Sequence, residues 1–158
     1  DWAEEAPKNL PSFLQYRSHI KGGSRFHTPP CFGIYVVREV LQWIKSKGGI
    51  TVLEKQNREK AKALYDVIDG TDFYSCPASP SHKNCRSNMN VVFRIRPDSA
   101  ESERLEKAFV QQSEAAGLSG LKGHRSVGGL RASIYNAHPV DGVKRLVEFM
   151  KDFEKKNG

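Results

Sequence analysis

The chain has 158 residues, which is enough for one folded domain with a hydrophobic core of its own. Its formal net charge is +7, but its 25 basic residues are interleaved with 18 acidic ones, and no run of about five or six like charges occurs. No apolar stretch reaches the roughly 18 residues that a membrane span needs. This composition argues against a membrane protein, and it indicates solvated helix faces with one local anion site rather than a nucleic-acid-binding tail.

The cysteines are Cys31, Cys76 and Cys85. An odd number of cysteines without a Cys-x-x-Cys pair argues against a disulfide framework and against a structural zinc site. His82 precedes Cys85 in a spacing that is only a weak metal signal, because no second pair of ligands accompanies it. We therefore expect free thiols, no bound metal and a reducing, intracellular compartment.

Residues 1–26 are expected to be irregular. Pro7 and Pro11 interrupt any helix, and the segment Gly22–Ser24 is typical of a flexible loop. Apolar residues such as Phe13 nevertheless occur in this region. We interpret them as a docking segment whose partner surface is not part of this chain.

Two helices are predicted next. Thr28 and Pro29 suit the cap and the first helical position of a helix over residues 27–48, in which apolar residues recur at helical spacing. A capping box at Thr51–Glu54 predicts the start of a second helix, which ends at Gly70. The charged residues of the second helix are interpreted as one solvated face: Glu54, Lys55, Arg58, Glu59, Lys60 and Lys62.

Alternation of apolar and polar residues predicts strands further on. Asn88–Arg96 alternates most clearly, Phe73–Cys76 is a shorter candidate, and Leu118–Leu121 is a candidate edge strand. A helix is expected after Asp98, and Pro139 opens a final helix with one apolar face: Val143, Leu146, Val147, Met150 and Phe153. From residue 27 the order is helix, helix, strand, strand, helix, strand, helix. This order predicts an α+β fold, with helices packed on a small, mostly antiparallel sheet.

The most informative stretch runs from Gly123 to Ala137 and reads GHRSVGGLRASIYNA. Its second half alternates, which predicts a strand with one buried face and with Arg131 on the open face. The glycine pair at 128–129 allows a bend with positive φ that folds His124 and Arg125 toward that face. We expect a cluster of cationic donors, and guanidinium groups match the paired oxygens of carboxylates and phosphates.

Any one of these arginines alone is more often a solvated surface charge, and a glycine pair is often only a turn. Here three cationic donors and two glycines fall within nine residues. An anion-binding site is therefore the better interpretation of the group.

The same stretch resembles the C-terminal signature of the phosphoserine aminotransferases, pyridoxal-phosphate enzymes of fold type I and class V. Three further segments resemble this family in the same order: His27–Phe32, Asn88–Val91 and Phe149–Phe153. The resemblance covers almost the whole chain. It implies the small C-terminal domain of a fold-type I transferase that depends on pyridoxal phosphate.

The resemblance also implies how the chain divides. Residues 1–26 would be a remnant of, or linker from, a large domain that is absent from this chain. Residues 27–48 would be the long connecting helix, and residues 49–158 the small domain.

In this family an amino group is transferred between O-phospho-L-serine or glutamate and 3-phosphohydroxypyruvate or 2-oxoglutarate, in serine biosynthesis. Arg131 matches the family arginine that holds the substrate α-carboxylate. His124 and Arg125 match the pair that reaches the phosphate of phosphoserine or the distal carboxylate of glutamate. The family contributes this pair across a homodimer, so the resemblance implies a homodimeric enzyme with phosphorylated and dicarboxylate substrates.

His27 and Thr28 match the position at which the family binds the cofactor phosphate of the neighbouring subunit. A helix N-terminus with a hydroxyl suits a phosphate, whereas the residues alone favour a plain N-cap role for Thr28. The usual family residue at position 27 is asparagine, so His27 departs from the pattern.

An aminotransferase also needs a lysine that binds the cofactor covalently and an acidic group on its ring nitrogen. In the family both belong to the large domain. The lysines of this chain stand on polar helix faces, in loops or beside helix ends, with none in an apolar strand-to-loop setting. We therefore expect no catalytic residue in this chain, no activity from it alone, and a longer complete enzyme.

Two alternatives stay open. A sister class-V aminotransferase would use another small amino acid, but His124 and Arg125 beside Arg131 favour a phosphorylated substrate. A stand-alone basic module for nucleic acid is disfavoured because Trp43 and Phe93 fall on apolar faces, away from the basic residues. We expect neither nucleic acid nor membrane as a partner, and a location in the cytoplasm or in an organelle such as a plastid.

Overall fold

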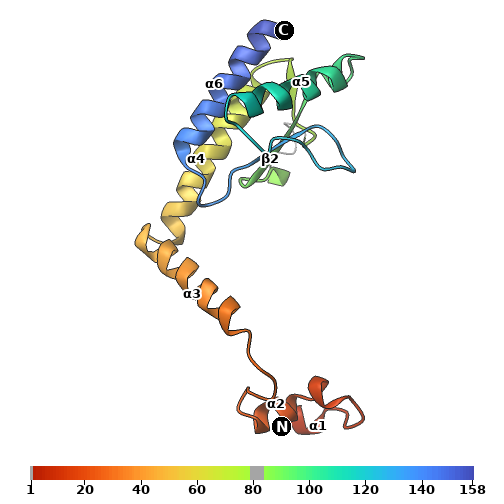
Figure 1. Ribbon diagram of the computed structural model, residues 1–158, viewed down its shortest axis with the longest axis vertical. Coiled ribbons are helices and arrows are strands. Elements are labelled where there is room, and N and C mark those ends of the chain that lie inside the picture. The colour runs from red at the N-terminus through yellow and green to blue at the C-terminus, as the bar shows by residue number, and fades with distance from the viewer. Residues whose placement is uncertain (1, 79–83) are drawn as a thin grey trace. The chain divides into compact units, whose positions relative to one another are not determined.

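The computed structural model describes residues 2–78 and 84–158, and the chain forms two compact units. Unit 1 (Asp1–Ser46) contains α1 (Trp2–Glu5), the 3-10 helix η1 (Ser12–Leu14), α2 (Tyr16–Lys21) and α3 (Cys31–Ser46). Unit 2 (Lys47–Gly158) contains α4 (Ile50–Asp69), β1 (Tyr74–Ser75), β2 (Asn90–Ile95), α5 (Ser102–Ala115), β3 (Leu130–Ser133) and α6 (Val140–Asn157) (Figure 1).

From α3 onward the elements follow the predicted order. The strands form one antiparallel sheet in the order β1-β2-β3, which confirms the α+β fold class. In unit 2, α4 and α6 lie side by side (Figure 1), α4 also contacts β1 and β2, and α5 contacts β2 and α6. Across the described residues, no helix combines the length and the apolar character that a membrane crossing requires.

The core of unit 2 lies between these helices and the sheet. Phe109 of α5 is completely buried, and its ring meets Phe149 and Phe153 of α6, each at 5.0 Å between centroids. The predicted apolar face of α6 is confirmed, because every third or fourth residue along it is buried: Val143, Leu146, Met150 and Phe153. Burial of such side chains stabilises the fold by about 2 kcal/mol each.

The expectation that residues 1–26 are irregular is wrong in part. Pro7 and Pro11 do interrupt the chain, but short helical turns form on either side of them. The guanidinium of Arg17 in α2 donates to the carbonyl oxygen of Ala6 at 2.9 Å, which ties α2 to the end of α1. Local hydrogen bonds therefore order a segment whose composition is typical of a loop.

The helix expected over residues 27–48 begins later, at Cys31, so Thr28 is not its cap. A proline disfavours helical geometry in the residue before it, and here Pro29 and Pro30 follow Thr28 in succession. Neither Thr28 nor Pro29 can therefore enter the helix easily. Within α3, all of whose residues the structure describes, no side chain is buried.

The start of α4 and one strand also differ from expectation. The helix begins at Ile50 after Gly49, without a side-chain cap, so the capping box expected at Thr51–Glu54 is not formed. The candidate edge strand at 118–121 is not a strand. A single bridge joins Lys122 to Leu130 instead, because that segment approaches β3 only at its end.

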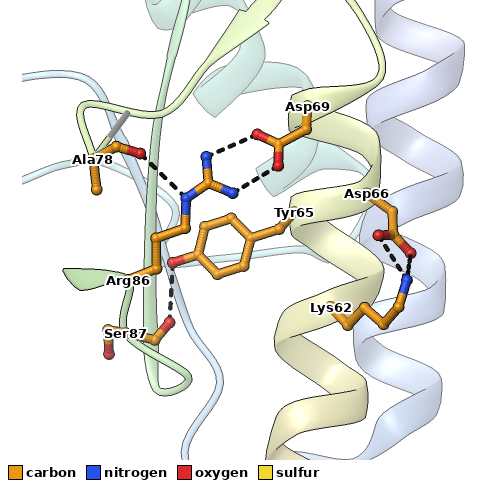
Figure 2. Close-up of polar contacts among 7 residues, drawn as sticks. All are labelled: Lys62, Tyr65, Asp66, Asp69, Ala78, Arg86 and Ser87. Carbon is orange, nitrogen blue, oxygen red and sulfur yellow. Dashed lines mark hydrogen bonds and ion pairs between the residues drawn. The ribbon is translucent and has the colours of Figure 1, made fainter. Parts of the chain in front are cut away.

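Arg86 anchors the connection between β1 and β2 to α4 (Figure 2). Its guanidinium donates to both carboxylate oxygens of Asp69, at 2.7 and 2.8 Å, and its Nε donates to the carbonyl oxygen of Ala78 at 3.1 Å. It also lies 4.7 Å from the ring centre of Tyr65. The Tyr65 hydroxyl donates to the carbonyl oxygen of Ser87, and partial burial raises the pKa of Tyr65 to about 12.

Candidate functional site

The β3 strand has two different faces, as predicted. Arg131 is half-buried on the open face and lies opposite Val92 in the antiparallel ladder with β2. On the same face, the hydroxyl of Ser133 donates to the side-chain oxygen of Asn90 at 3.1 Å. The alternating residues are all buried: Leu130, Ala132 and Ile134.

The loop of residues 123–129 turns back on itself just before β3. The N–H of Gly123 donates to the carbonyl oxygen of Gly129 at 2.9 Å, and the N–H of Gly128 donates to that of His124 at 2.8 Å. Gly128 and Gly129 have φ values of 74° and 69°, in the left-handed region that favours glycine. The predicted bend at the glycine pair is confirmed.

A pocket of about 440 Å³ lies between this loop and α5. Its lining includes His124 and Arg125 from the loop and Glu103 and Glu106 from α5. Both carboxylates already form ion pairs with other basic residues, so they do not neutralise the cations of the loop. The Nδ1 atom of His124 lies 2.8 Å from the hydroxyl of Ser126, which orients the imidazole ring.

Arg125 and Arg131 differ from most arginines in the described part of the chain, which donate to an acceptor as Arg94 does. No described residue accepts a hydrogen bond from either guanidinium, a property shared with Arg25 and Arg96. The Nε of Arg131 is in addition buried without a partner. A buried donor without an acceptor costs about 1–3 kcal/mol. An anion that accepts from Arg131 would remove this cost.

The expected single cluster of three cations is formed only in part. His124 and Arg125 share the 440 Å³ pocket, whereas Arg131 lies outside its lining, on the open face of the sheet. The loop carries the first two residues past the end of β3 and along α5. The structure thus divides the three predicted donors into two groups.

His27 and Thr28 lie in unit 1 and are both exposed. The Nδ1 atom of His27 lies 3.1 Å from the carbonyl oxygen of Thr28, and the imidazole ring packs against Phe13 at 5.0 Å between centroids. No described residue is hydrogen-bonded to the Thr28 hydroxyl. A hydroxyl and an imidazole side by side are a donor set that suits a phosphate.

Lys60 does not belong to the solvated face of α4, where the sequence analysis placed it. Only 2% of the residue is exposed, and its amine donates to the carbonyl oxygens of Ile134, Tyr135 and His138 at 3.1, 2.8 and 3.0 Å. Burial lowers the pKa of this amine. A signal was available, because Lys60 falls within the helical series of buried α4 residues: Leu53, Asn57, Ala61, Leu64, Val67 and Ile68.

Asn57 adds a second tie between α4 and the chain that follows β3. Its amide donates to the side-chain oxygen of Asn136 at 2.7 Å. Burial and the nearby charge of Lys60 lower the pKa of His138 in the same segment. These contacts hold the end of the strand that carries Arg131.

Within the described residues, no three His, Cys, Asp or Glu side chains are arranged to hold a metal ion. His82, noted for its spacing from Cys85, lies outside the described residues. Cys31, Cys76 and Cys85 are free thiols.

Comparison with known protein families identifies the family of this chain. The sequence profile described as "Aminotransferase class-V" matches residues 8–146, which is most of the chain. The chain belongs to the class-V aminotransferase family.

Relatives of this class-V aminotransferase chain are named phosphoserine aminotransferase. The protein of Desulfatibacillum aliphaticivorans is 51% identical over 159 residues, which cover 100% of this chain and 42% of that protein. The protein of Niallia circulans is 48% identical over 160 residues, with the same coverage. The chain thus spans about 42% of the length of these relatives.

Solved structures agree with the family. A phosphoserine aminotransferase from Bacillus circulans subsp. alkalophilus matches with a TM-score of 0.82 and 48% identity, over 99% of this chain and 41% of that chain. A PLP-bound phosphoserine aminotransferase from Trichomonas vaginalis matches with a TM-score of 0.75 and 37% identity, over 92% and 40%. The resemblance inferred from the sequence motifs of this class-V aminotransferase is confirmed.

Proposed function

We propose that this chain is part of a phosphoserine aminotransferase, which transfers an amino group between O-phospho-L-serine or glutamate and 3-phosphohydroxypyruvate or 2-oxoglutarate. The observation that carries this proposal is the pair of guanidinium groups without acceptors, on Arg125 and Arg131, in one segment of unit 2. The names of the relatives support it, and so does their length, which leaves room for a large domain with the catalytic residues.

Two groups of donors suit a substrate with anionic groups at both ends. Arg131 presents a planar fork that matches the two oxygens of an α-carboxylate. His124 and Arg125, at the pocket, would take the phosphate of phosphoserine or the distal carboxylate of glutamate. A small neutral amino acid would leave the second group of cations without an acceptor, which disfavours the sister aminotransferase.

Pyridoxal phosphate is the cofactor in this proposal, and when bound it supplies the electron sink that amino-group transfer needs. His27 and Thr28 would hold its phosphate, because the Thr28 hydroxyl has no protein partner in the described chain. The Nδ1 atom of His27 is engaged with a backbone carbonyl, which leaves Nε2 for the phosphate. Because Nδ1 donates to that carbonyl oxygen, Nε2 can donate to the phosphate only when the ring is protonated.

The covalent attachment of the cofactor is assigned to a lysine outside this chain. Lys60 is the buried lysine of the described α4 helix, and its amine is already occupied by three carbonyl groups. A homodimer in which His124, Arg125, His27 and Thr28 serve a neighbouring subunit, and an intracellular location, belong to the same proposal.

The test uses the full-length enzyme with Arg131→Ala. Loss of a bidentate, charge-assisted contact should raise KM for phosphoserine and for 2-oxoglutarate on the order of 100-fold. Arg104→Ala removes an exposed arginine of α5 that pairs with Glu101 and should leave both KM values unchanged. Steady-state kinetics with both substrates decide the question, and unchanged KM values in Arg131→Ala would overturn the assignment.

A further inference from the structure

Arg94 of β2 crosses the start of β3 where only glycine leaves room for it. Phe93 pairs with Leu130 in the ladder, so Arg94 and Gly129 are the next neighbours along it. A Cβ atom on Gly129 would lie 2.4 Å from the Cδ of Arg94 and 3.1 Å from its Nε. The side chain of Arg94 therefore rests directly on the backbone at one end of the 123–129 loop.

Glu106 of α5 holds Arg94 in this position. The Nε of Arg94 donates to the Oε1 of Glu106 at 2.6 Å, and the Glu106 side chain is only 11% exposed. The same oxygen accepts the backbone N–H of Ile95 at 3.3 Å. A nearly buried carboxylate with two donors has little freedom to move, unlike the exposed ion pairs elsewhere on α5.

Gly129 connects the Arg94 side chain to the backbone next to His124 and Arg125. Its carbonyl oxygen accepts the N–H of Gly123, which closes the base of the loop, and His124 and Arg125 follow at once. Glu106 lines the same pocket as these two cations. A shift of Arg94 would therefore move the base of the loop and both cationic side chains with it.

We propose that Arg94 and Glu106 are positioning residues that hold the 123–129 loop, so that His124 and Arg125 meet the second anionic group of the substrate. Neither residue binds the substrate itself. The inference rests on the proposed function, because it takes His124 and Arg125 as the residues that bind the second anionic group of the substrate.

The experiment compares the full-length wild-type enzyme with its Glu106→Gln variant. This substitution keeps the shape of the side chain but removes its charge. KM for O-phosphoserine should rise on the order of fivefold, with kcat within about twofold. The matched control is Glu101→Gln at the N-cap of α5, which removes an exposed carboxylate paired with Arg104 and should change neither value. Arg94→Met should reproduce the rise in KM.

A double-mutant cycle with Arg125→Ala separates positioning from a general loss of structure. If the pair acts through the loop, Glu106→Gln should raise KM by a smaller factor once Arg125 is absent, because only His124 is then left to be positioned. An equal fold-change in both backgrounds, or no change in either, would overturn the inference. If Glu106→Gln does not fold, the same cycle is measured with Arg94→Lys, which keeps Glu106 paired with a cation. The same outcomes then support or overturn the inference.

The same data distinguish a failure of the positioning role from a failure of the proposed function. A wild-type enzyme that does not use O-phosphoserine, or an Arg125→Ala variant with unchanged KM, would remove the proposed function. A wild-type enzyme and an Arg125→Ala variant that behave as proposed, beside an unaffected Glu106→Gln variant, would remove only the positioning role.

Discussion

Lys60 shows how a charged residue can have a structural role next to the proposed anion site. Its amine supplies donors to three carbonyl groups of the segment that follows β3. These carbonyls lie beyond the end of the strand ladder, where backbone groups need other partners. That of Tyr135 also accepts the N–H of His138 at 2.9 Å. We therefore propose that the buried lysine holds the end of the strand that carries Arg131, with no part in the chemistry.

We expect Lys60→Met to destabilise unit 2 by about 3 kcal/mol at neutral pH, because it removes the donor to the carbonyl groups of Ile134, which is buried, and of His138. Hydrogen–deuterium exchange should rise in residues 134–138. Lys62→Met, which removes an exposed lysine of the same helix, is the control and should leave exchange there unchanged. Unchanged protection of residues 134–138 in Lys60→Met would contradict the role assigned to Lys60.

The pH dependence of stability has a definite sign at this residue. Burial lowers the pKa of Lys60 in the folded chain below its ordinary value of 10.5. Between the lowered pKa and about 10.5 the unfolded chain therefore binds more protons, so the contribution of Lys60 to the unfolding free energy increases as pH rises. The difference in thermal midpoint between wild type and Lys60→Met should grow across this interval.

At the scale of the element, α4 anchors the connection between β1 and β2 (Figure 2). Arg86 reaches Asp69 in the last turn of the helix, and only 6% of its side chain is exposed. The Lys62–Asp66 pair on the same helix joins two side chains that are 74% and 60% exposed. The two ion pairs offer a direct comparison of partly buried and solvated pairing.

We expect Asp69→Asn to lower the unfolding free energy by about 3 kcal/mol, because it leaves the nearly buried Arg86 without its carboxylate. Asp66→Asn should cost no more than about 0.5 kcal/mol, since exposed pairs on helices contribute little. Thermal unfolding of both variants, monitored by circular dichroism, gives the comparison. Equal losses would show that the Arg86 network does not anchor the segment.

The elements also show which local signals are dependable. The periodic apolar face of α6 predicts both its existence and its buried side, because that pattern reflects one continuous packing surface. The starts of α3 and α4 were less predictable. Thr28 is kept out of α3 by the two prolines that follow it, and α4 begins directly after Gly49 rather than at the capping box.

For the whole molecule, unit 1 leaves large apolar side chains uncovered. In α3, Phe32 is 80% exposed and Val37 is 58% exposed. Soluble proteins rarely leave several large apolar side chains of one helix exposed to solvent. Relatives of this family are more than twice as long as the chain. We expect the additional residues of a complete enzyme to cover these side chains and to supply the lysine that binds the cofactor.

The 158-residue chain alone should therefore show no transamination. Incubation with pyridoxal phosphate, O-phosphoserine and 2-oxoglutarate should produce no glutamate above a protein-free control. The full-length enzyme under the same conditions is the positive control. Turnover by the short chain that is lost in Lys60→Met would contradict the expectation and would give the buried lysine a chemical role.

The sequence alone determined the order of the elements from α3 onward, the bend at Gly128 and Gly129, and the family. These features depend on local periodicity, on the conformational freedom of glycine and on contiguous motifs, all of which can be seen in a linear chain. Tertiary structure decided the burial of Lys60, the contact of Arg94 with Gly129 and Glu106, and the separation of Arg131 from the pocket that holds His124 and Arg125. Such contacts join residues on different elements, so no local pattern specifies them before the chain has folded.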